Sequence, residues 1–359
     1  MRTVYLNGKF LAQRTTGVQR FAARVVIALD RQLAADGRRW VLLCPPQGEA
    51  PALAHIELRR VAGPVRSLHA WEQLALPRAA RGGLLVNLAG SAPWFAPRQV
   101  ATLHDAAVFD HPEAYAPAFV AWYRRLFRRL GRRAERLLTV SAFSRQRLVQ
   151  ALGVAPERFA IVPCGADHLD GVVADDAVIS RLGLEGRRFV LAVGSENPTK
   201  NQAGLLAAWR RLQPGSDFRL VLVGGRNQRV FQDGGAGDDP PGVLRTGWLP
   251  DAPLVALYRR AEALAFPSHY EGFGLPPVEA MSCGCPVLAA RAASLPEVCG
   301  DAALYVDPAD PADIAAGLQR LIGDEALRSR LRAAGRERVA SCTWAASATA
   351  LRRAVEAVA

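Results

Sequence analysis

The sequence predicts an α/β protein built from two doubly wound, Rossmann-like domains. Its 359 residues exceed what one hydrophobic core usually supports, and 50% of them are hydrophobic, enough to fill two cores. Short apolar runs rich in β-formers alternate with helical patterns in two series along the chain. Such alternation is typical of parallel sheets with helices on both faces, in which ligands bind beyond the carboxyl ends of the strands.

Each series of apolar runs is expected to form one sheet. The first comprises residues 4–6, 41–44, 84–88, 100–103, 137–140 and 160–163. The second comprises residues 189–193, 219–223, 243–246, 263–266, 286–289 and 304–306. The polar segment 167–176 between them is the predicted linker, with a boundary near residue 172. We therefore expect a first domain over 1–172, a second over 173–342 and a final amphipathic helix within 343–359.

The formal charge of +12 is carried almost entirely by arginine, since only Lys9 and Lys200 are lysines. No recognised nucleic-acid module accompanies this charge, so nucleic-acid binding is not expected. The densest basic run, residues 123–138, has apolar residues at helical spacing, which predicts one inward face and one face lined by arginines. That arginine face is either solvated or a surface for anionic lipid.

Targeting and redox features are sparse. There is no uninterrupted run of about 18 apolar residues, so we expect a cytoplasmic protein, with peripheral contact at the inner membrane face as an option. The six cysteines lack the paired spacing of a zinc site and are expected to be reduced and mostly buried. Cys283 and Cys285 lie two apart but have no second ligand pair nearby, so no metal site is predicted.

A glycine loop between two glutamates is the strongest local signal. Gly272 and Gly274 allow the backbone to approach a ligand, and Pro277 suits the first turn of a helix whose NH groups favour an anion. Glu271 and Glu279 on either side are placed to bind hydroxyl groups flanking that anion. The segment predicts a site for a phosphate and a sugar.

Two further loops have features of anion sites. Segment 194–201 follows a predicted strand, begins with Gly194 and carries Lys200 just before a helix, although it lacks the second glycine of a P-loop. In the first half, Gly17 lies where a loop becomes a helix N-terminus. His104 closes a predicted strand and is expected to face the ligand side of the sheet.

Residues 267–276 (Pro-Ser-His-Tyr-Glu-Gly-Phe-Gly-Leu-Pro), with a second glutamate after seven residues, closely resemble the signature of retaining nucleotide-sugar glycosyltransferases of family 4. The resemblance covers nearly the whole chain and is strongest over 189–308, with mannosyl- and rhamnosyltransferases of surface-polysaccharide assembly as the nearest type. It implies the GT-B fold, in which two Rossmann-like domains face each other across a cleft. It also implies that the final helix crosses back to the first domain.

The resemblance also implies roles around the donor. Lys200 corresponds to a lysine that binds the pyrophosphate, but the arginine often found after the glycine is Ser195 here, which leaves the second cation unassigned. Arg226, after the glycines ending at Gly225, is one candidate. The donor-binding loops are expected to include the residues Gly194, Gly225, Gly272, Phe273, Gly274 and Leu275. Trp248 and Leu249 are expected to frame the base, mainly through their backbone.

The two glutamates receive different roles. By resemblance, Glu279 holds the ribose hydroxyls. Glu271 holds a donor-sugar hydroxyl or stabilises the oxocarbenium-like ring, and a covalent nucleophile is the alternative. In the first domain, the resemblance places Gly17 beside the donor phosphates and His104 near the transferred sugar. Segments 71–77 and 87–91 are candidates for acceptor contacts.

The predicted activity is transfer of a hexosyl group, with GDP-mannose as the first guess for the donor, to a saccharide or lipid-linked saccharide. No Asp-x-Asp motif is present, and neither metal nor cofactor is expected. The alternatives are a sugar-nucleotide epimerase or hydrolase on the same fold, and a noncatalytic nucleotide- or nucleic-acid-binding protein. A dinucleotide oxidoreductase is disfavoured because no strand is followed by Gly-x-Gly-x-x-Gly.

Overall fold

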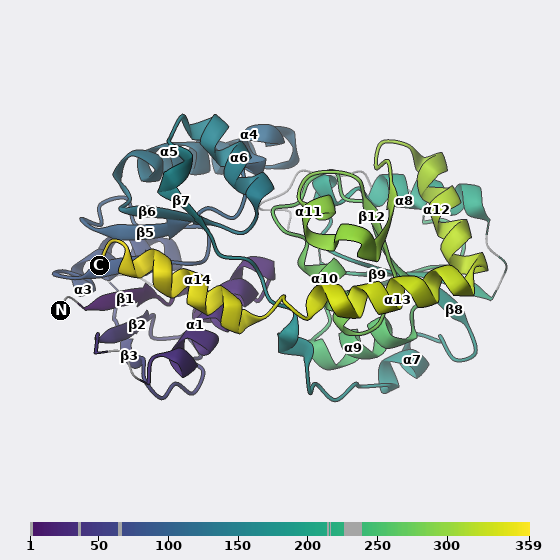
Figure 1. Ribbon diagram of the computed structural model, residues 1–359, viewed down its shortest axis with the longest axis horizontal. Helices are drawn as coiled ribbons and strands as arrows, with labels where there is room; N and C mark the ends of the chain where they lie inside the picture. The colour runs from purple at the N-terminus through teal and green to yellow at the C-terminus, as the bar shows by residue number, and fades with distance from the viewer. Residues whose placement is uncertain (1–2, 35–36, 64–66, 214, 216, 226–238) are drawn as a thin grey trace. The chain divides into compact units, whose positions relative to one another are not determined.

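The computed structural model describes residues 3–34, 37–63, 67–213, 215, 217–225 and 239–359 (Figure 1). The chain forms two compact units. The first comprises Met1–Ala106, Ala121–Cys164 and Trp344–Ala359, and the second Ala107–Val120 and Gly165–Thr343. The division after Cys164 precedes the predicted boundary at 172 because Ala166 and Leu169 belong to the hydrophobic core of the second unit.

The first unit contains a seven-stranded sheet in the order β3-β2-β1-β4-β5-β6-β7, and every neighbouring pair is parallel. Its strands are β1 (Val4–Asn7), β2 (Trp40–Cys44), β3 (Glu57–Arg60), β4 (Leu84–Asn87), β5 (Gln99–Thr102), β6 (Arg136–Thr139) and β7 (Phe159–Ile161). The first and fourth strands are therefore neighbours, and the order reverses direction between them.

The second unit contains a six-stranded parallel sheet in the order β10-β9-β8-β11-β12-β13. Its strands are β8 (Arg188–Val193), β9 (Phe218–Val223), β10 (Val243–Gly247), β11 (Ala263–Phe266), β12 (Val287–Ala290) and β13 (Ala303–Val306). Alternate residues of β8 enter different cores, Phe189 and Leu191 one and Val190 the other. Because successive strand residues point to opposite faces, both faces of this sheet are covered.

Helices connect the strands. Those of the first unit are α1 (Gly17–Gln32), α2 (Leu68–Ala70), a π-helical turn (Trp71–Ala75), α3 (Leu76–Ala79), α5 (Pro117–Arg133, which begins in the second unit), α6 (Ala142–Leu152) and α14 (Trp344–Glu356). Those of the second are α4 (Ala107–Asp110), α7 (Ala177–Arg181), α8 (Gln202–Leu212), α9 (Asp251–Arg260), α10 (Leu275–Ser282), α11 (Leu295–Cys299), α12 (Pro311–Gly323) and α13 (Glu325–Val339). Short 3-10 turns include η1 (Lys9–Ala12), η3 (Pro112–Ala114), η4 (Pro156–Arg158), η5 (Asp167–Leu169), η6 (Pro198–Lys200) and η7 (Gly300–Ala302).

The structure confirms every predicted strand and adds β3. The sequence Glu-Leu-Arg-Arg of β3 gave no apolar signal because the strand lies at the edge of its sheet, where even Leu58 is 40% exposed. The helical reading of 123–138 is correct only as far as Arg133, because Leu137 and Leu138 lie in β6. The inward face of α5 is confirmed by buried Leu126, Phe127 and Leu130.

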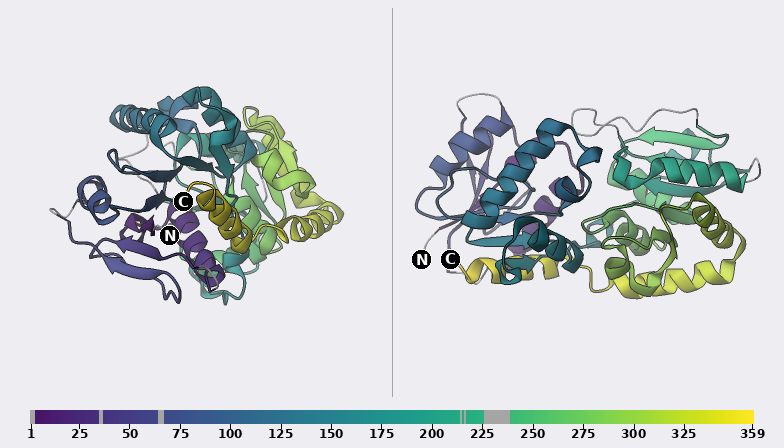
Figure 2. Two further views of the ribbon diagram at one scale, coloured as in Figure 1. Left: turned by 60° about the vertical axis from the view of Figure 1, so that its left-hand side comes forward. Right: turned by 90° about the horizontal axis from the view of Figure 1, so that it is seen from above.

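The last helix completes the first unit. Trp344, Ala348 and Leu351 of α14 are buried, and α14 lies alongside α1 in both Figure 1 and Figure 2. The Trp344 ring stands edge-on to Phe21 of α1, with 6.1 Å between their centroids. The Ser347 hydroxyl donates a hydrogen bond to the Pro163 carbonyl at 2.6 Å, beyond the end of β7.

Three glycines join the ends of β8, β9 and β10. The Gly194 NH donates to the Val223 carbonyl, and the Gly224 NH donates to the Gly247 carbonyl, each at 2.9 Å. Gly224 has φ 152°, and a Cβ at this position would lie 1.7 Å from the Gly194 carbonyl oxygen. Only glycine fits this contact, because the Gly194 carbonyl belongs to the backbone and cannot rotate away as a side chain would.

Replacing Gly224 with alanine should therefore destabilise the second unit by about 2–4 kcal/mol, through steric overlap and backbone strain. Urea unfolding of the full chain followed by circular dichroism measures the change. Gly323→Ala is the matched control, since a Cβ there meets nothing within 4 Å. Equal stability of the two variants would show that the strand ends are not packed as described.

Candidate functional site

A lysine–glutamate pair lies at the carboxyl edge of the second sheet. The Lys200 ammonium donates to both carboxylate oxygens of Glu271, with Nζ 2.7 Å from each. Lys200 ends the η6 turn after β8, and Glu271 follows β11, the strand beside β8. The glutamate side chain is 8% exposed and the lysine side chain 26%, so the pair is shielded but the ammonium is still reachable from solvent.

Asparagine side chains fix the loop that carries Lys200. Asn201 adopts a left-handed conformation, φ 56°, and caps α8 by accepting from the Gly204 NH. Its amide donates to the Pro267 and Pro308 carbonyls at 3.0 and 2.7 Å. Asn197 accepts from both the NH and the hydroxyl of Thr199. These bonds tie the lysine loop to the segment that carries Glu271.

The glycine loop after Glu271 is held by Ser294. The fully buried Ser294 hydroxyl lies 3.0 Å from both the Glu271 and the Phe273 carbonyl oxygens. Gly274 is left-handed, φ 93°, and starts α10. The helix then begins Leu-Pro-Pro, so two of its first NH groups are missing. The first turn of α10 therefore offers few NH donors, and backbone NH groups of the preceding glycine loop are the other donors near this position.

Glu279 is the fifth residue of α10 and is slightly more buried than Glu271. His168 Nε2 lies 3.0 Å from Glu279 Oε1, and the Tyr258 hydroxyl donates to Oε2 at 3.1 Å. A carboxylate only accepts, so Nε2 carries a hydrogen. Burial and the glutamate charge raise the pKa of Tyr258 well above its usual range, which keeps the phenol protonated as a donor. Its two hydrogen-bond partners named here, His168 and Tyr258, are not members of the Lys200–Glu271 pair.

The predicted phosphate loops adjoin this pair only in part. Gly194 lies next to Lys200, whose Cγ would be 3.7 Å from a Cβ on the glycine. Gly225 follows β9 and is partly buried, whereas Arg226 lies outside the described residues. Arg245 at the end of β10 faces this edge but is bound by Asp239 at 2.7 Å and lies 3.5 Å from Glu196. Hydrogen bonding to Asp239 raises the pKa of Arg245 and keeps it cationic.

The predicted base-framing residues differ in burial. Trp248 is 48% exposed, and Leu249 packs against the hydrophobic core of the second unit. Tyr270, immediately before Glu271, is buried and donates from its hydroxyl to Asp110 of α4 at 2.9 Å. The neighbouring His111 ring stands edge-on to Tyr270 at 5.0 Å between centroids. No pattern in the sequence indicated these contacts.

In the first unit, Gly17 and His104 lie in different settings. Gly17 begins α1 as predicted, in open space, and Thr16 makes no capping bond. His104 is mostly buried, with Nε2 2.9 Å from the Leu88 carbonyl and its ring edge-on to Phe21 at 5.0 Å. Burial lowers the pKa of His104 to about 4, so the ring is neutral near pH 7.

The cysteines behave as buried thiols. All six are free, and Cys44, Cys164, Cys285 and Cys299 are buried. Burial raises the pKa of Cys283 to about 11 and that of Cys285 further, so neither is a thiolate at neutral pH.

Within the described residues, no group of three or more His, Cys, Asp or Glu side chains is placed to hold a metal ion. Likewise, no helix among them is long and apolar enough to cross a membrane.

Comparison with known proteins identifies related families over both units. A model of "Glycosyl transferases group 1" matches residues 176–338, and a model of "Glycosyltransferase Family 4" matches residues 22–168. O-antigen chain mannosyltransferase B of Escherichia coli is 32% identical over 69% of this chain and 67% of its own length. The MMP alpha-(1->4)-mannosyltransferase of Mycolicibacterium hassiacum is 33% identical over 67% of this chain and 60% of its own.

Solved structures share the fold over the full length. Sucrose-phosphate synthase from Thermosynechococcus elongatus aligns with a TM-score of 0.74 at 22% identity, covering 100% of both chains. The HepE protein of Anabaena, solved with UDP and glucose, aligns with a TM-score of 0.72 at 17% identity over 99% of this chain and 100% of its own. The predicted GT-B class is confirmed by these likenesses and by the two parallel sheets.

Removing the Ser294 hydroxyl tests how the glycine loop is held. Ser294→Ala removes the one hydroxyl hydrogen that the Glu271 and Phe273 carbonyls share and should cost about 1–2 kcal/mol of unfolding free energy. The comparison is Ser341→Ala, an exposed serine whose loss should change stability by less than about 0.5 kcal/mol. If both variants unfold at the same urea concentration, the Ser294 bonds do not hold the loop.

Proposed function

Because the chain belongs to the group 1 and family 4 glycosyltransferases, we propose that it moves a hexosyl group from a nucleoside diphosphate sugar to a saccharide or lipid-linked saccharide, with retention at the anomeric carbon. The two mannosyltransferase relatives support mannose as the transferred sugar. GDP-mannose is our proposed donor. The O-antigen enzyme among them supports a role in polysaccharide assembly.

The observation that carries the proposal is the contact of Lys200 with both oxygens of Glu271 at 2.7 Å. This contact sets one cation and one carboxylate side by side at the carboxyl edge of a parallel sheet, where ligands of such folds bind. A bound diphosphate would compete with Glu271 for the ammonium. Donor binding would thereby free Glu271 oxygens to accept hydrogen bonds from the sugar.

The proposed transfer needs two kinds of electrostatic stabilisation. The bond between the anomeric carbon and the β-phosphate oxygen breaks, and a bond to the acceptor oxygen forms on the same face of the ring. The acceptor proton passes to the departing phosphate oxygen. Lys200 and the NH groups of the glycine loop would stabilise the diphosphate, while Glu271 would stabilise the positive ring.

Two observations refine the roles of the glutamates. Lys200 contacts both Glu271 oxygens, and we assign sugar binding and ring stabilisation to this glutamate, with covalent attack as the alternative. Glu279 is oriented by His168 and Tyr258, and we keep it as the candidate that binds the ribose hydroxyls. Trp248, Leu249, Gly194 and Gly225 remain our candidates for the base and the phosphates, and Gly17 for the phosphates from the first unit.

Activity measurements on variants of the pair test this assignment. Lys200→Met should lower kcat by about 100- to 1,000-fold by removing transition-state charge stabilisation. Glu271→Gln should lower kcat similarly with a smaller effect on the nucleotide affinity. Glu297→Gln, an exposed glutamate of α11, is the control and should keep wild-type rates. Unchanged kcat in both test variants would refute the site.

The donor and the stereochemistry need a separate measurement. We expect GDP-mannose to raise the Tm more than other nucleotide sugars, because a ligand that binds only the folded state stabilises it by mass action. The anomeric configuration of the product, read by NMR, should match that of the donor, and EDTA should leave the rate unchanged. Free sugar or an isomerised donor in the absence of acceptor would indicate a hydrolase or an epimerase instead.

We also propose that the enzyme contacts the inner membrane face through an arginine–aromatic surface of the first unit, which would suit a lipid-linked acceptor. We define this surface as His69, Leu74, Trp94, Phe95, Trp122 and the exposed arginines of α5. Their rings form a chain, with 4.9 Å between His69 and Trp122 centroids and 5.8 Å between Trp122 and Trp94. Arg129 lies 5.2 Å from both the Trp94 and the Phe95 rings.

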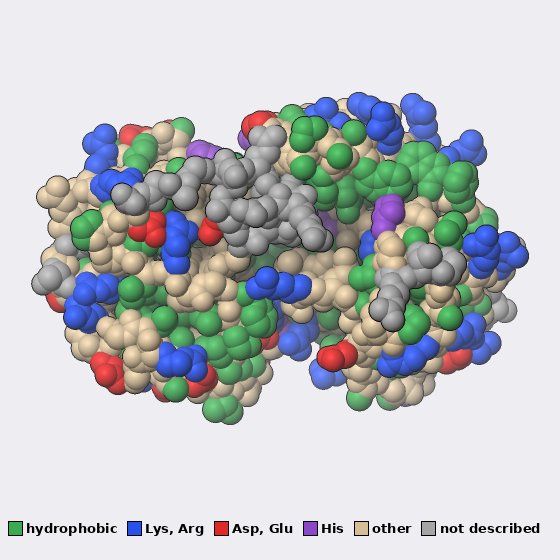
Figure 3. Space-filling view, turned by 180° about the vertical axis from the view of Figure 1, so that it is seen from behind, with side chains coloured by type: hydrophobic (Ala, Val, Ile, Leu, Met, Phe, Trp, Pro, Cys, Tyr) green, Lys and Arg blue, Asp and Glu red, His purple; other side chains and the backbone are tan. Residues whose placement is uncertain are grey.

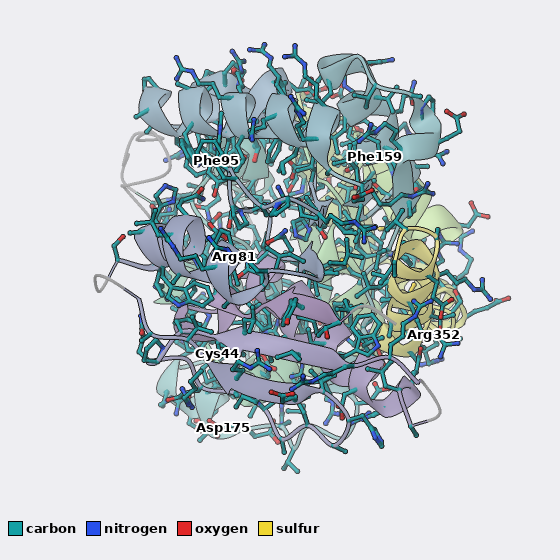
Figure 4. The ribbon with its side chains drawn as sticks, turned by 90° about the vertical axis from the view of Figure 1, so that its left-hand side faces the viewer. Cys44, Arg81, Phe95, Phe159, Asp175 and Arg352 are labelled. Atoms are coloured by element: carbon teal, nitrogen blue, oxygen red, sulfur yellow. The ribbon has the colours of Figure 1, made fainter. Side chains whose placement is uncertain are left out.

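Exposure and charge support a lipid partner for this surface. Phe95 is 75% exposed and lies beside α5 in Figure 4. Helix α5 contains no acidic residue, and Arg125, Arg128, Arg132 and Arg133 are exposed on it. In Figure 3 hydrophobic side chains adjoin basic ones on this unit. Aromatic rings favour the membrane interface, and arginines are attracted to anionic headgroups.

Vesicle sedimentation tests the surface. The protein should bind phosphatidylglycerol vesicles but not phosphatidylcholine vesicles, and salt should weaken binding. Arg125→Glu/Arg128→Glu should weaken it on the order of tenfold or more, given about 1 kcal/mol per arginine. Arg210→Glu/Arg211→Glu on α8 makes the same charge change elsewhere and should have little effect. Equal losses in both variants would indicate nonspecific charge attraction.

A further inference from the structure

The other lysine of the chain also forms a close ion pair, in the first unit. Lys9 lies in the η1 turn after β1, and its Nζ is 2.7 Å from Glu72 Oε2. The glutamate side chain is 1% exposed and the lysine side chain 10%. Glu72 lies on the π-helical turn, an irregularity that is common at functional positions and here directs a carboxylate into the unit.

Neighbouring polar groups close this pair into a network. The Ser91 hydroxyl accepts from Lys9 Nζ at 3.1 Å and donates to Glu72 Oε1 at 2.7 Å. Asn7 Nδ2 donates to the same carboxylate oxygen at 3.0 Å. A buried ion pair adds little to stability compared with apolar packing. It does restrict the hydrogen-bonded side chains around it to one arrangement. This arrangement fixes the position of Ser91.

The network holds the turn at residues 88–90 from both ends. Ser91 follows the turn, and Asn87 precedes it. Asn87 accepts from Asn7 at 2.9 Å and donates to the Val100 carbonyl at 3.1 Å. Within the turn, Gly90 is left-handed with φ 72°, and a Cβ added there would lie 3.4 Å from His104 Cδ2. Displacing the turn would therefore also displace the Leu88 carbonyl, which lies 2.9 Å from His104 Nε2.

The turn determines which ring nitrogen of His104 carries the hydrogen. Nε2 lies 2.9 Å from the Leu88 carbonyl oxygen, which can only accept. A neutral His104 must then be protonated at Nε2, which leaves Nδ1 with a free lone pair. Within the described part of the chain, no residue donates to Nδ1. The sequence indicated His104 and segments 71–77 and 87–91 as candidates, but no pattern in it indicated the bonds that join them.

We infer that Lys9, Glu72 and Ser91 are positioning residues that fix the 88–90 turn and so hold His104 as its Nε2-protonated tautomer, with Nδ1 presented to accept a hydrogen bond from a substrate hydroxyl. The last clause rests on the proposed function, whereas the tautomer and its dependence on the network do not. The pair lies beside β1 and β4, where the strand order of the sheet reverses and ligands of doubly wound folds bind.

Nitrogen-15 NMR of the full chain with labelled histidine tests the tautomer without any activity assay. The chain has six histidines, and His104→Gln identifies the resonances of His104 by their loss. The wild type should show protonated Nε2 and bare Nδ1 at pH 7. Glu72→Gln and Ser91→Ala should each give a mixture of the two tautomers, because the Leu88 carbonyl is no longer held against Nε2.

The control is Glu57→Gln in β3, which removes the carboxylate from an exposed ion pair of the same unit. It should leave the His104 resonances unchanged. Circular dichroism must show that the variants are folded, and if Glu72→Gln is not, Ser91→Ala decides the outcome. Wild-type protonation at Nδ1, or unchanged His104 resonances in the folded variants, would overturn the positioning role.

Kinetics of the same variants test the functional clause. With the donor proposed above, kcat/KM should fall on the order of 10- to 100-fold in Ser91→Ala, as expected for a misplaced polar contact. If the tautomer changes but the kinetics do not, the substrate does not bind Nδ1. The positioning role of the network would still stand. If the wild type shows no transfer at all, the proposed function fails, and the NMR result still stands by itself.

Discussion

Both sheets are entirely parallel, and this constraint determines where the chemistry of the chain is placed. In a parallel sheet all loops that follow strands lie along one edge, so residues distant in sequence meet there. Lys200 follows the first strand of its sheet and Glu271 the fourth, and these strands are neighbours. Lys9 and Ser91 follow the first and fourth strands of the other sheet in the same way. Each unit thus has a lysine at its topological switch point.

The choice of lysine at these two positions stands out in a chain whose other cations are arginines. An ammonium is a compact charge with three donors, whereas a guanidinium is a wide planar fork. The ammonium is the better fit at both positions. Lys9 contacts Glu72 and Ser91 at short range, and Lys200 contacts two oxygens of one carboxylate. Their exposures differ, with Lys9 enclosed and Lys200 accessible, in keeping with a positioning role for one and ligand binding for the other.

Sequence patterns predicted the fold well because each buried strand carries its own apolar signal, and they failed at β3, an edge strand with polar residues. They located Lys200 and Glu271 but not the bond between them. They also missed the partners of Glu279, because His168 lies 111 residues away and a lone histidine carries no signal of its neighbour. Asn201 was detectable as a helix cap, but its bonds to Pro267 and Pro308 depend on tertiary packing.

The packing of α14 on α1 has a consequence for biosynthesis. The chain leaves the first unit at Cys164, forms most of the second, and returns with Trp344 to cover an apolar face of α1. That face stays uncovered during synthesis until the second unit and α14 have been made. The second unit can fold as it emerges from the ribosome, whereas the first is completed last, which makes it the part that most needs protection by chaperones.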